Sequence, residues 1–245
     1  MPQNIQPNFI LIFTVSISLF GLFTTLMLAL YPPTIQENLL WRKPFIGSIF
    51  SLICILGIIA AFFPNKCSKT FNLLEAEKPA VSNAKDRNFN KVLVTLKGHH
   101  PDCKEFSAHV IHISSHTLCA ACTGLYLGAF ISIIGTAFYF FGGGRIYEMS
   151  FPAVVIGIVG VILGYLQLKF RGFVRLMLNT LFVLGAFLTL VGIDELTQSL
   201  SVDLFSIVLI VFWIFTRIML SHWDHRRICL NCKSPCENRR LEKLG

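Results

Sequence analysis

Residues 9–31, FILIFTVSISLFGLFTTLMLALY, decide the fold class, because they form a long apolar run without a charge. The core of a bilayer is about 30 Å thick, so a helix that spans it needs roughly 20 such residues. Pro32 and Pro33 end the run, since proline cannot supply the backbone N–H that a continuing helix needs. The preceding residues carry no Lys or Arg, so we expect a retained transmembrane helix and not a cleaved signal peptide.

Further apolar stretches of similar length follow the first one. They cover about residues 44–63, 122–141, 151–168, 173–193 and 202–220. Hydrophobic residues make up 54% of the chain and charged residues 14%, whereas a soluble domain carries about 25% charged residues. Backbone polar groups must be paired inside lipid, which requires helices here. The sequence therefore predicts an all-α, polytopic membrane bundle of about six transmembrane helices and excludes a soluble globular domain.

Composition divides the chain into four parts. We expect an N-terminal transmembrane hairpin at 1–63, a flexible cytoplasmic tether at 64–96, a Cys/His module with a four-helix membrane core at 97–221, and a Cys/His-containing tail at 222–245. Most of the 21 Lys and Arg residues fall in segments that share one side of such a bundle. The positive-inside rule then places both termini in the cytoplasm, in a multi-pass protein of the plasma membrane.

Most of the Cys and His residues gather in two clusters on the expected cytoplasmic face. In the first cluster, fifteen residues separate Cys103 from Cys119, which approximates the spacing of paired zinc knuckles. Zinc would bind His100, Cys103, Cys119 and Cys122 in a tetrahedron, with His99 as the alternative to His100. Cytosolic thiols stay reduced, which disfavours structural disulfides. The alternative is a CxxC pair of free thiols or a redox pair.

The second cluster is His225, Cys229, Cys232 and Cys236, with His222 nearby as an additional ligand. These residues supply another set of four ligands in a basic, polar tail. Zinc is the predicted cofactor here too, and an iron–sulfur cluster is the runner-up because it also takes four, mainly thiolate, ligands. Two alternatives stay open, namely one site shared by both clusters and an unstructured tail with incidental thiols.

Three more histidines, His109, His112 and His116, lie between the halves of the first cluster. On a helix they would share a face with Cys119 and could form a second ligand set or a proton path. If residues 110–114 form a strand instead, His112 and His116 share a face and His109 points away. A polar face at the membrane interface is the simpler explanation of the three.

Two polar positions near the end of the fifth span, Asp194 and Gln198, are candidate functional residues. Asp194 is either part of a solvated helix end or an intramembrane group, and intramembrane ionisable groups are functional candidates by default. Arg217, near the cytoplasmic end of the last span, is expected to extend to the membrane surface and not to pair with Asp194. Small residues spaced by four at 124–128 and 160–164 permit close helix contact.

Residues 118–128, LCAACTGLYLG, resemble a motif of an uncharacterised prokaryotic family of predicted membrane proteins, the domain of unknown function 2085. That family carries C-A-R-C-T-G-I-Y-x-G at the start of a helix, an upstream C-H pair and a later D-G-x-x-Q. Here Ala121 replaces the Arg, residues 99–103 (HHPDC) stand for the upstream pair, and residues 194–198 (DELTQ) stand for the later motif. The resemblance covers about residues 97–220. It implies a helical membrane protein with a Cys/His site, and it implies no activity.

Three functions fit these features, in this order. The first is an integral membrane protein with a structural or partner-docking zinc module; the second is a thiol–disulfide oxidoreductase that uses Cys119 and Cys122; the third is a metal-ion or proton transporter. No nucleophile elbow, phosphate-binding loop or HExxH motif occurs, so an enzyme is disfavoured. We expect the lipid bilayer and either a protein partner or a second copy as partners. We expect no nucleic acid, because no basic segment is interleaved with aromatic residues.

Overall fold

The computed structural model describes residues 8–33, 39–62, 109–113 and 116–231. Its elements in chain order are α1 (Asn8–Leu30), α2 (Arg42–Phe62), β1 (Val110–Ile113), β2 (His116–Cys119), α4 (Ala120–Thr136), the π-helical η3 (Ala137–Phe141), η4 (Tyr147–Met149), α5 (Ser150–Leu166), η5 (Gln167–Lys169), α6 (Gly172–Thr197) and α7 (Leu200–Asn231). Among these described residues, six helices are long and apolar enough to cross a membrane. This confirms the prediction of an all-α, multi-pass membrane protein.

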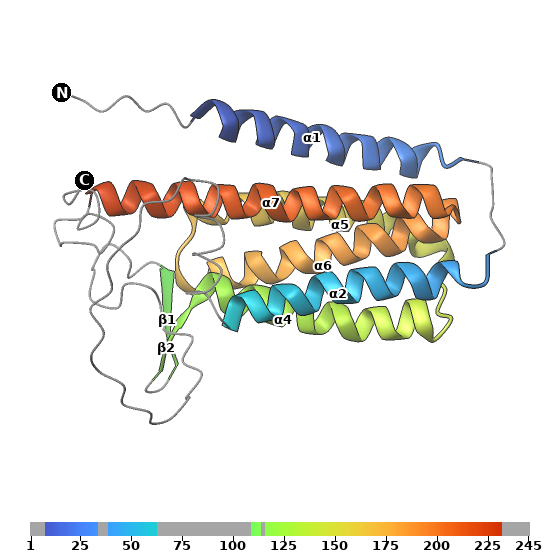
Figure 1. The fold of residues 1–245 in the computed structure, drawn as a ribbon, viewed down its shortest axis with the longest axis horizontal. Coiled ribbons are helices and arrows are strands. Elements are labelled where there is room, and N and C mark those ends of the chain that lie inside the picture. Colours follow the sequence, from blue (N-terminus) through green and yellow to red (C-terminus); the bar gives the residue numbers. More distant parts are fainter. Residues whose placement is uncertain (1–7, 34–38, 63–108, 114–115, 232–245) are drawn as a thin grey trace, which may run out of the picture.

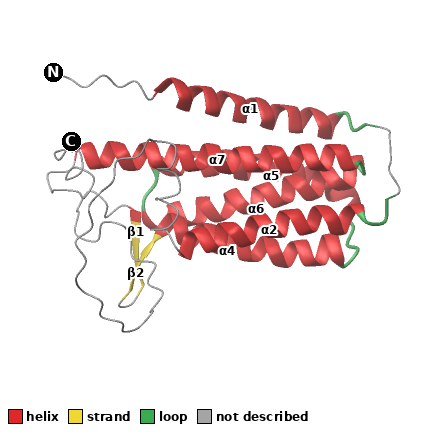
Figure 2. Cartoon of the chain, viewed as in Figure 1, coloured by secondary structure: helices red, strands yellow, loops and turns green. Residues whose placement is uncertain are grey.

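The long helices run side by side and give the bundle two distinct ends (Figure 1). The start of α1, the end of α7 and strands β1 and β2 lie together at one end, which we call the hairpin end. The start of α2, with Arg42, lies at the other end, which we call the Arg42 end. Short connections join η3 to α5 and α6 to α7 at the Arg42 end (Figure 2).

The exterior of the bundle is apolar, as a protein surrounded by lipid requires. Phe20 on α1 is 68% exposed, Phe138 in η3 is 73% exposed and Phe173 on α6 is 62% exposed. A soluble monomer rarely exposes large apolar areas of this kind, because contact with water would be costly. The interior is filled by other large side chains, among them Phe182 and Trp213, each 1% exposed.

Helix α6 lies at the centre of the bundle and contacts α4, α5 and α7. Its closest contacts are made by glycines. A Cβ atom on Gly160 would lie 2.7 Å from the carbonyl oxygen of Leu181, and one on Gly185 would lie 2.6 Å from that of Gly157. A Cβ on Gly124 would also collide with the α6 backbone. The predicted small-residue patterns at 124–128 and 160–164 therefore mark true packing surfaces.

The first two helices flank the core on separate sides. Helix α1 packs against α7, α5 and α6, whereas α2 packs against α4, η3 and α7. A buried hydrogen bond of 2.7 Å between the hydroxyls of Ser18 and Thr216 joins α1 to α7. The expected N-terminal hairpin thus consists of two helices that each contact the core more than each other.

Strands β1 and β2 form an antiparallel hairpin in which Val110 pairs with Cys119. The helical interpretation of residues 109–119 is therefore wrong, because β-branched residues in this segment favour a strand. The strand alternative holds for residues 110–113. His112 and His116 lie on different strands, however, so they do not follow one another along a single strand.

The last helix extends further than expected. The apolar run ends near residue 220, but α7 continues to Asn231 and includes the first ten residues of the predicted tail. No Gly or Pro interrupts residues 221–231, so nothing in the local sequence stops the helix. Asp224 on this extension also binds Arg175 of α6.

Candidate functional sites at the two ends of the bundle

The thiols of Cys119 and Cys122 meet at the hairpin end, where β2 becomes α4. Cys119 is the last residue of the strand and the N-cap of the helix, with φ −72° and ψ 116°. Both cysteines are free and half-buried. The thiol of Cys122 and the backbone N–H groups of Ala121 and Cys122 donate hydrogen bonds to the sulfur of Cys119. Two sulfur atoms thus face one point, as a metal knuckle or a redox pair requires.

The surroundings of Cys119 favour its thiolate. The hydrogen bond from the Cys122 thiol, with help from backbone N–H groups and the charge of Arg175, lowers the pKa of Cys119 to about 6. Burial opposes this effect but does not overcome it. At neutral pH, Cys119 is therefore an anion next to a thiol donor. The Arg217 guanidinium also interacts electrostatically with both cysteines.

Arg175 fixes the hairpin to the bundle. Its side chain is 3% exposed, and its Nη2 lies 3.4 Å from Oδ2 of Asp224 on α7. Its Nη1 lies 3.2 Å from Nε2 of His109, just before β1. Because a guanidinium can only donate, His109 Nε2 accepts this hydrogen bond. The lone pair that would make His109 Nε2 a metal ligand is thus engaged by Arg175.

Arg217 is buried in the bundle, and the expectation that it extends to the membrane surface is wrong. It is 6% exposed, and its Nε donates to Oδ1 of Asn179 at 3.0 Å. Its Nη2 donates to the same oxygen. Asn179 in turn donates from Nδ2 to the carbonyl oxygen of Arg175 at 2.6 Å. These hydrogen bonds and the nearby thiols give the buried guanidinium of Arg217 the partners that a buried charge needs.

The described part of the chain supplies only part of the predicted metal ligands. Within residues 8–33, 39–62, 109–113 and 116–231, no three His, Cys, Asp or Glu side chains gather as a metal site. His99, His100 and Cys103 lie outside the described residues. The first four-ligand site therefore stays a prediction, and only Cys119 and Cys122 of its members are described by the structure.

The second cluster is divided in the same way. His225 and Cys229 lie on the last turns of α7, whereas Cys232 and Cys236 lie outside the described residues. His222 is exposed on α7. The second site stays a prediction, now one in which two of the four ligands belong to a helix.

Asp194 lies at the centre of a second group of polar side chains, at the Arg42 end. It is fully buried, and its Oδ1 lies 2.6 Å from Nη1 of Arg42. The same nitrogen also contacts Oδ2 of Asp203, which is likewise fully buried. Of the two alternatives for Asp194, the solvated helix end is therefore wrong, because the side chain is buried inside the bundle. Gln198 ends α6 in a left-handed conformation, and its N–H donates to the Asp194 carbonyl at 3.0 Å.

Three further residues complete this group. The hydroxyl of Tyr139 lies 2.7 Å from Oδ2 of Asp194 and 2.7 Å from Oε2 of Glu195. The Nζ of Lys43 lies 3.4 Å from Oε2 of Glu195 and 3.7 Å from Oδ2 of Asp194. We call the whole set the Arg42 cluster, and its members are Arg42, Lys43, Tyr139, Asp194, Glu195 and Asp203.

Sequence reasoning missed most of the Arg42 cluster. It identified Asp194, but it began the second apolar stretch at about residue 44 and therefore left out Arg42 and Lys43. The sequence did contain a signal. Because successive spans cross the membrane in opposite directions, the start of the second span and the end of the fifth lie on the same side. Basic residues at the first position and acidic residues at the second could have predicted the ion pairs between them.

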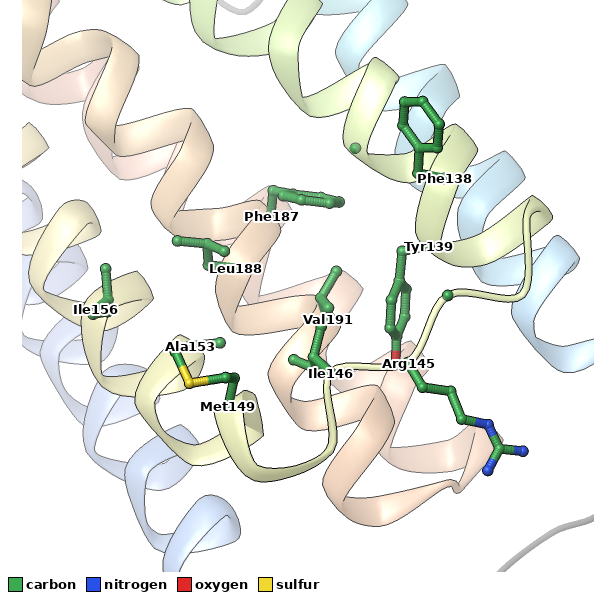
Figure 3. Close-up of a pocket in the computed structure, with 12 residues that line it drawn as sticks. Phe138, Tyr139, Arg145, Ile146, Met149, Ala153, Ile156, Phe187, Leu188 and Val191 are labelled. Carbon is green, nitrogen blue, oxygen red and sulfur yellow. The ribbon is translucent and has the colours of Figure 1, made fainter.

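An apolar pocket of about 410 Å³ borders the Arg42 cluster (Figure 3). Ile146, Met149 and Phe187 line it, and the ring of Tyr139 forms part of its wall. Arg145 points away from the pocket. The Tyr139 ring thus separates this apolar space from the buried charges that its hydroxyl contacts.

No protein family, curated protein or solved structure matches this chain. The resemblance of residues 118–128 to the prokaryotic membrane family therefore stays a prediction. The functional interpretation depends on the two sites themselves.

Proposed function

We propose that this chain is an integral membrane protein that binds zinc at its hairpin end through Cys119 and Cys122, as a structural or partner-docking module. One observation carries the proposal: the free side chains of Cys119 and Cys122 face one point at the junction of a strand and a helix. Zinc in structural sites is bound by thiolates and imidazoles in a tetrahedron. The backbone N–H groups that donate to Cys119 would hold its sulfur in the position needed by the metal.

The charges around the thiols support a ligand set rich in sulfur. Three thiolates and one neutral imidazole around Zn²⁺ carry a net negative charge. Arg175 and Arg217 interact electrostatically with the thiols and would offset that charge. The same charges would repel a zinc ion bound only by neutral ligands.

The position of the hairpin indicates what such a site would do. The predicted ligands His100 and Cys103 precede β1 in the sequence, and Cys119 and Cys122 follow β2. One metal bound by all four would close the hairpin against the start of α4. His109, Arg175 and Asp224 already dock the hairpin on α6 and α7. The module would present a rigid surface at the face that positive charge assigns to the cytoplasm.

Elemental analysis of the purified protein tests the zinc proposal. We expect about two zinc ions per chain, one lost in Cys119→Ser/Cys122→Ser and the other in Cys229→Ser/Cys232→Ser. One zinc ion lost in both variants would instead indicate a single shared site. Cys54→Ala is the matched control, because this thiol is buried within α2 and should leave the zinc content unchanged. Protein without zinc and with a titratable disulfide would overturn the proposal.

Thiol–disulfide exchange is the second candidate, and the anionic state of Cys119 favours it. The Cys119 thiolate would attack one sulfur of a substrate disulfide and displace the other sulfur as a thiolate. Cys122 would lose its proton to the displaced thiolate, attack the sulfur of Cys119 and release the second substrate thiolate. The chain would gain a disulfide, and the substrate would become one thiol and one thiolate, which takes up a proton from water. A reversible Cys119–Cys122 disulfide in zinc-free protein would support this candidate, and a zinc-loaded protein inert to disulfides would contradict it.

A further inference from the structure

The charges of the Arg42 cluster do not balance if every group is ionised. Arg42 and Lys43 contribute two positive charges, and Asp194, Glu195 and Asp203 contribute three negative charges. Arg42 is 4% exposed, and both aspartates are fully buried. An uncompensated charge is very costly at such a depth, whereas a neutral form avoids that cost. One bound proton would make the cluster neutral.

The two aspartates are close enough to share that proton. Both contact the same Arg42 nitrogen. Asp203 also lies within hydrogen-bonding distance of Asp194. Two carboxylates can form a hydrogen bond only if one of them carries a proton, and paired carboxyl groups in proteins hold a proton in this way.

Two further observations point to a proton in the cluster. Asp203 Oδ1 is buried and accepts no hydrogen bond from a donor group of the described residues, so full ionisation would leave a charged oxygen unsatisfied. The Tyr139 hydroxyl has one hydrogen, yet it lies 2.7 Å from both Asp194 and Glu195. Only one of these carboxyl groups can accept that hydrogen fully. The other makes a full hydrogen bond only if it carries a proton itself.

We propose that Asp194 and Asp203 form a proton-binding site that holds one exchangeable proton at neutral pH. Among the described residues, the groups that face the two aspartates come from four elements: Arg42 and Lys43 from α2, Tyr139 from η3, Glu195 from α6, and Asp203 itself from α7. This site lies at the end of the bundle opposite the thiols, so it is separate from the proposed zinc module.

The outer members of the cluster provide a route for the proton. The Lys43 side chain is 24% exposed and the Glu195 side chain is 8% exposed, whereas the aspartates are fully buried. From Glu195, the hydroxyl of Tyr139 leads to Asp194 through two contacts of 2.7 Å. A proton can therefore pass from Glu195 through the phenol to Asp194 and Asp203.

Infrared spectroscopy of the full chain in lipid at pH 7 tests this proposal. A protonated carboxyl group has a C=O stretching band that shifts in D₂O. We expect this band in the wild type and its loss in both Asp194→Asn and Asp203→Asn, because each substitution leaves two cations and two carboxylates. Glu148→Gln is the matched control, because Glu148 is an exposed carboxylate at the same end.

The result for the wild type decides the proposal even if a variant fails to fold. A wild type without the band would overturn it, and so would folded variants that both keep the band. Loss of the band in only one variant would contradict a shared proton. Tyr139→Phe should keep the band but lose its fast exchange in D₂O, and unchanged exchange would overturn the route. These measurements do not depend on zinc content, so their outcome tests the proton-binding site independently of the proposed zinc module.

Discussion

Cys119 should react as a thiolate at a pH where most cysteines do not. Its pKa is lowered to about 6 by the hydrogen bond from Cys122, whereas an ordinary thiol titrates near about 8.5. As the pH rises through about 6, the thiolate fraction and the alkylation rate should rise together and then level off. The measurement is the rate of iodoacetamide labelling of metal-free protein, read from the Cys119 peptide by mass spectrometry.

Cys122→Ala is the informative variant for this experiment. It removes the thiol that donates to Cys119, so the midpoint of the labelling profile should move to higher pH. Wild-type labelling with a midpoint near that of an ordinary thiol would contradict the proposed environment of Cys119.

On the scale of single residues, the sequence predicts which residues are functional candidates better than it predicts the residues that they contact. The CxxC spacing identifies Cys119 and Cys122, because residues that close in the chain must also be close in space. One partner of Asp194 is Arg42, which lies 152 positions away, so only the packing of α2 against the rest of the bundle brings them together. Arg217 was misjudged for the same reason, because its acceptor, Asn179, belongs to another helix.

The contact between α5 and α6 should be sensitive to a single methyl group. A Cβ on Gly185 would lie 2.6 Å from the Gly157 carbonyl oxygen, and the backbone cannot move away easily. We expect Gly185→Ala to lower the free energy of unfolding by about 1–3 kcal/mol. The measurement is thermal unfolding in detergent, followed by circular dichroism.

Gly57→Ala is the matched control for this substitution. Gly57 is also in a helix, but a Cβ there would meet nothing within 4 Å. Alanine favours a helix over glycine by up to about 1 kcal/mol, so this variant should be as stable as the wild type or more stable. Equal losses in both variants would show that the close approach of α5 and α6 is not the cause.

The helices were predictable because a bilayer imposes a length and a composition on each span. The residues at which the helices end were harder to predict. Helix α7 continues past its apolar run, since residues 221–231 lack a stop signal and Asp224 gains Arg175 as a partner. In residues 109–119, histidines at helical spacing suggested a helix, but β-branched residues and pairing between the strands produced a hairpin.

On the scale of the whole molecule, the two polar clusters of the described residues lie at opposite ends of an apolar bundle. The thiols with Arg175 and Arg217 occupy the hairpin end, and the Arg42 cluster occupies the other. The side of the membrane on which each end lies decides which chemistry each can perform. Thiols stay reduced and free to bind metal in the cytoplasm, whereas outside it they tend to form disulfides.

Labelling with a membrane-impermeant maleimide should locate both ends. Phe170→Cys places a thiol in the turn between α5 and α6 at the hairpin end, and Glu148→Cys places one at the Arg42 end. Both positions are exposed, and neither change removes a Lys or Arg that sets the orientation. We read the labelling from the peptide that carries each new cysteine, because the native thiols also react. In intact cells we expect labelling at position 148 alone, with position 170 labelled after permeabilisation. The reverse pattern would place Cys119 and Cys122 outside the cytoplasm, where exchange between thiols and disulfides becomes the stronger candidate and the zinc module the weaker one.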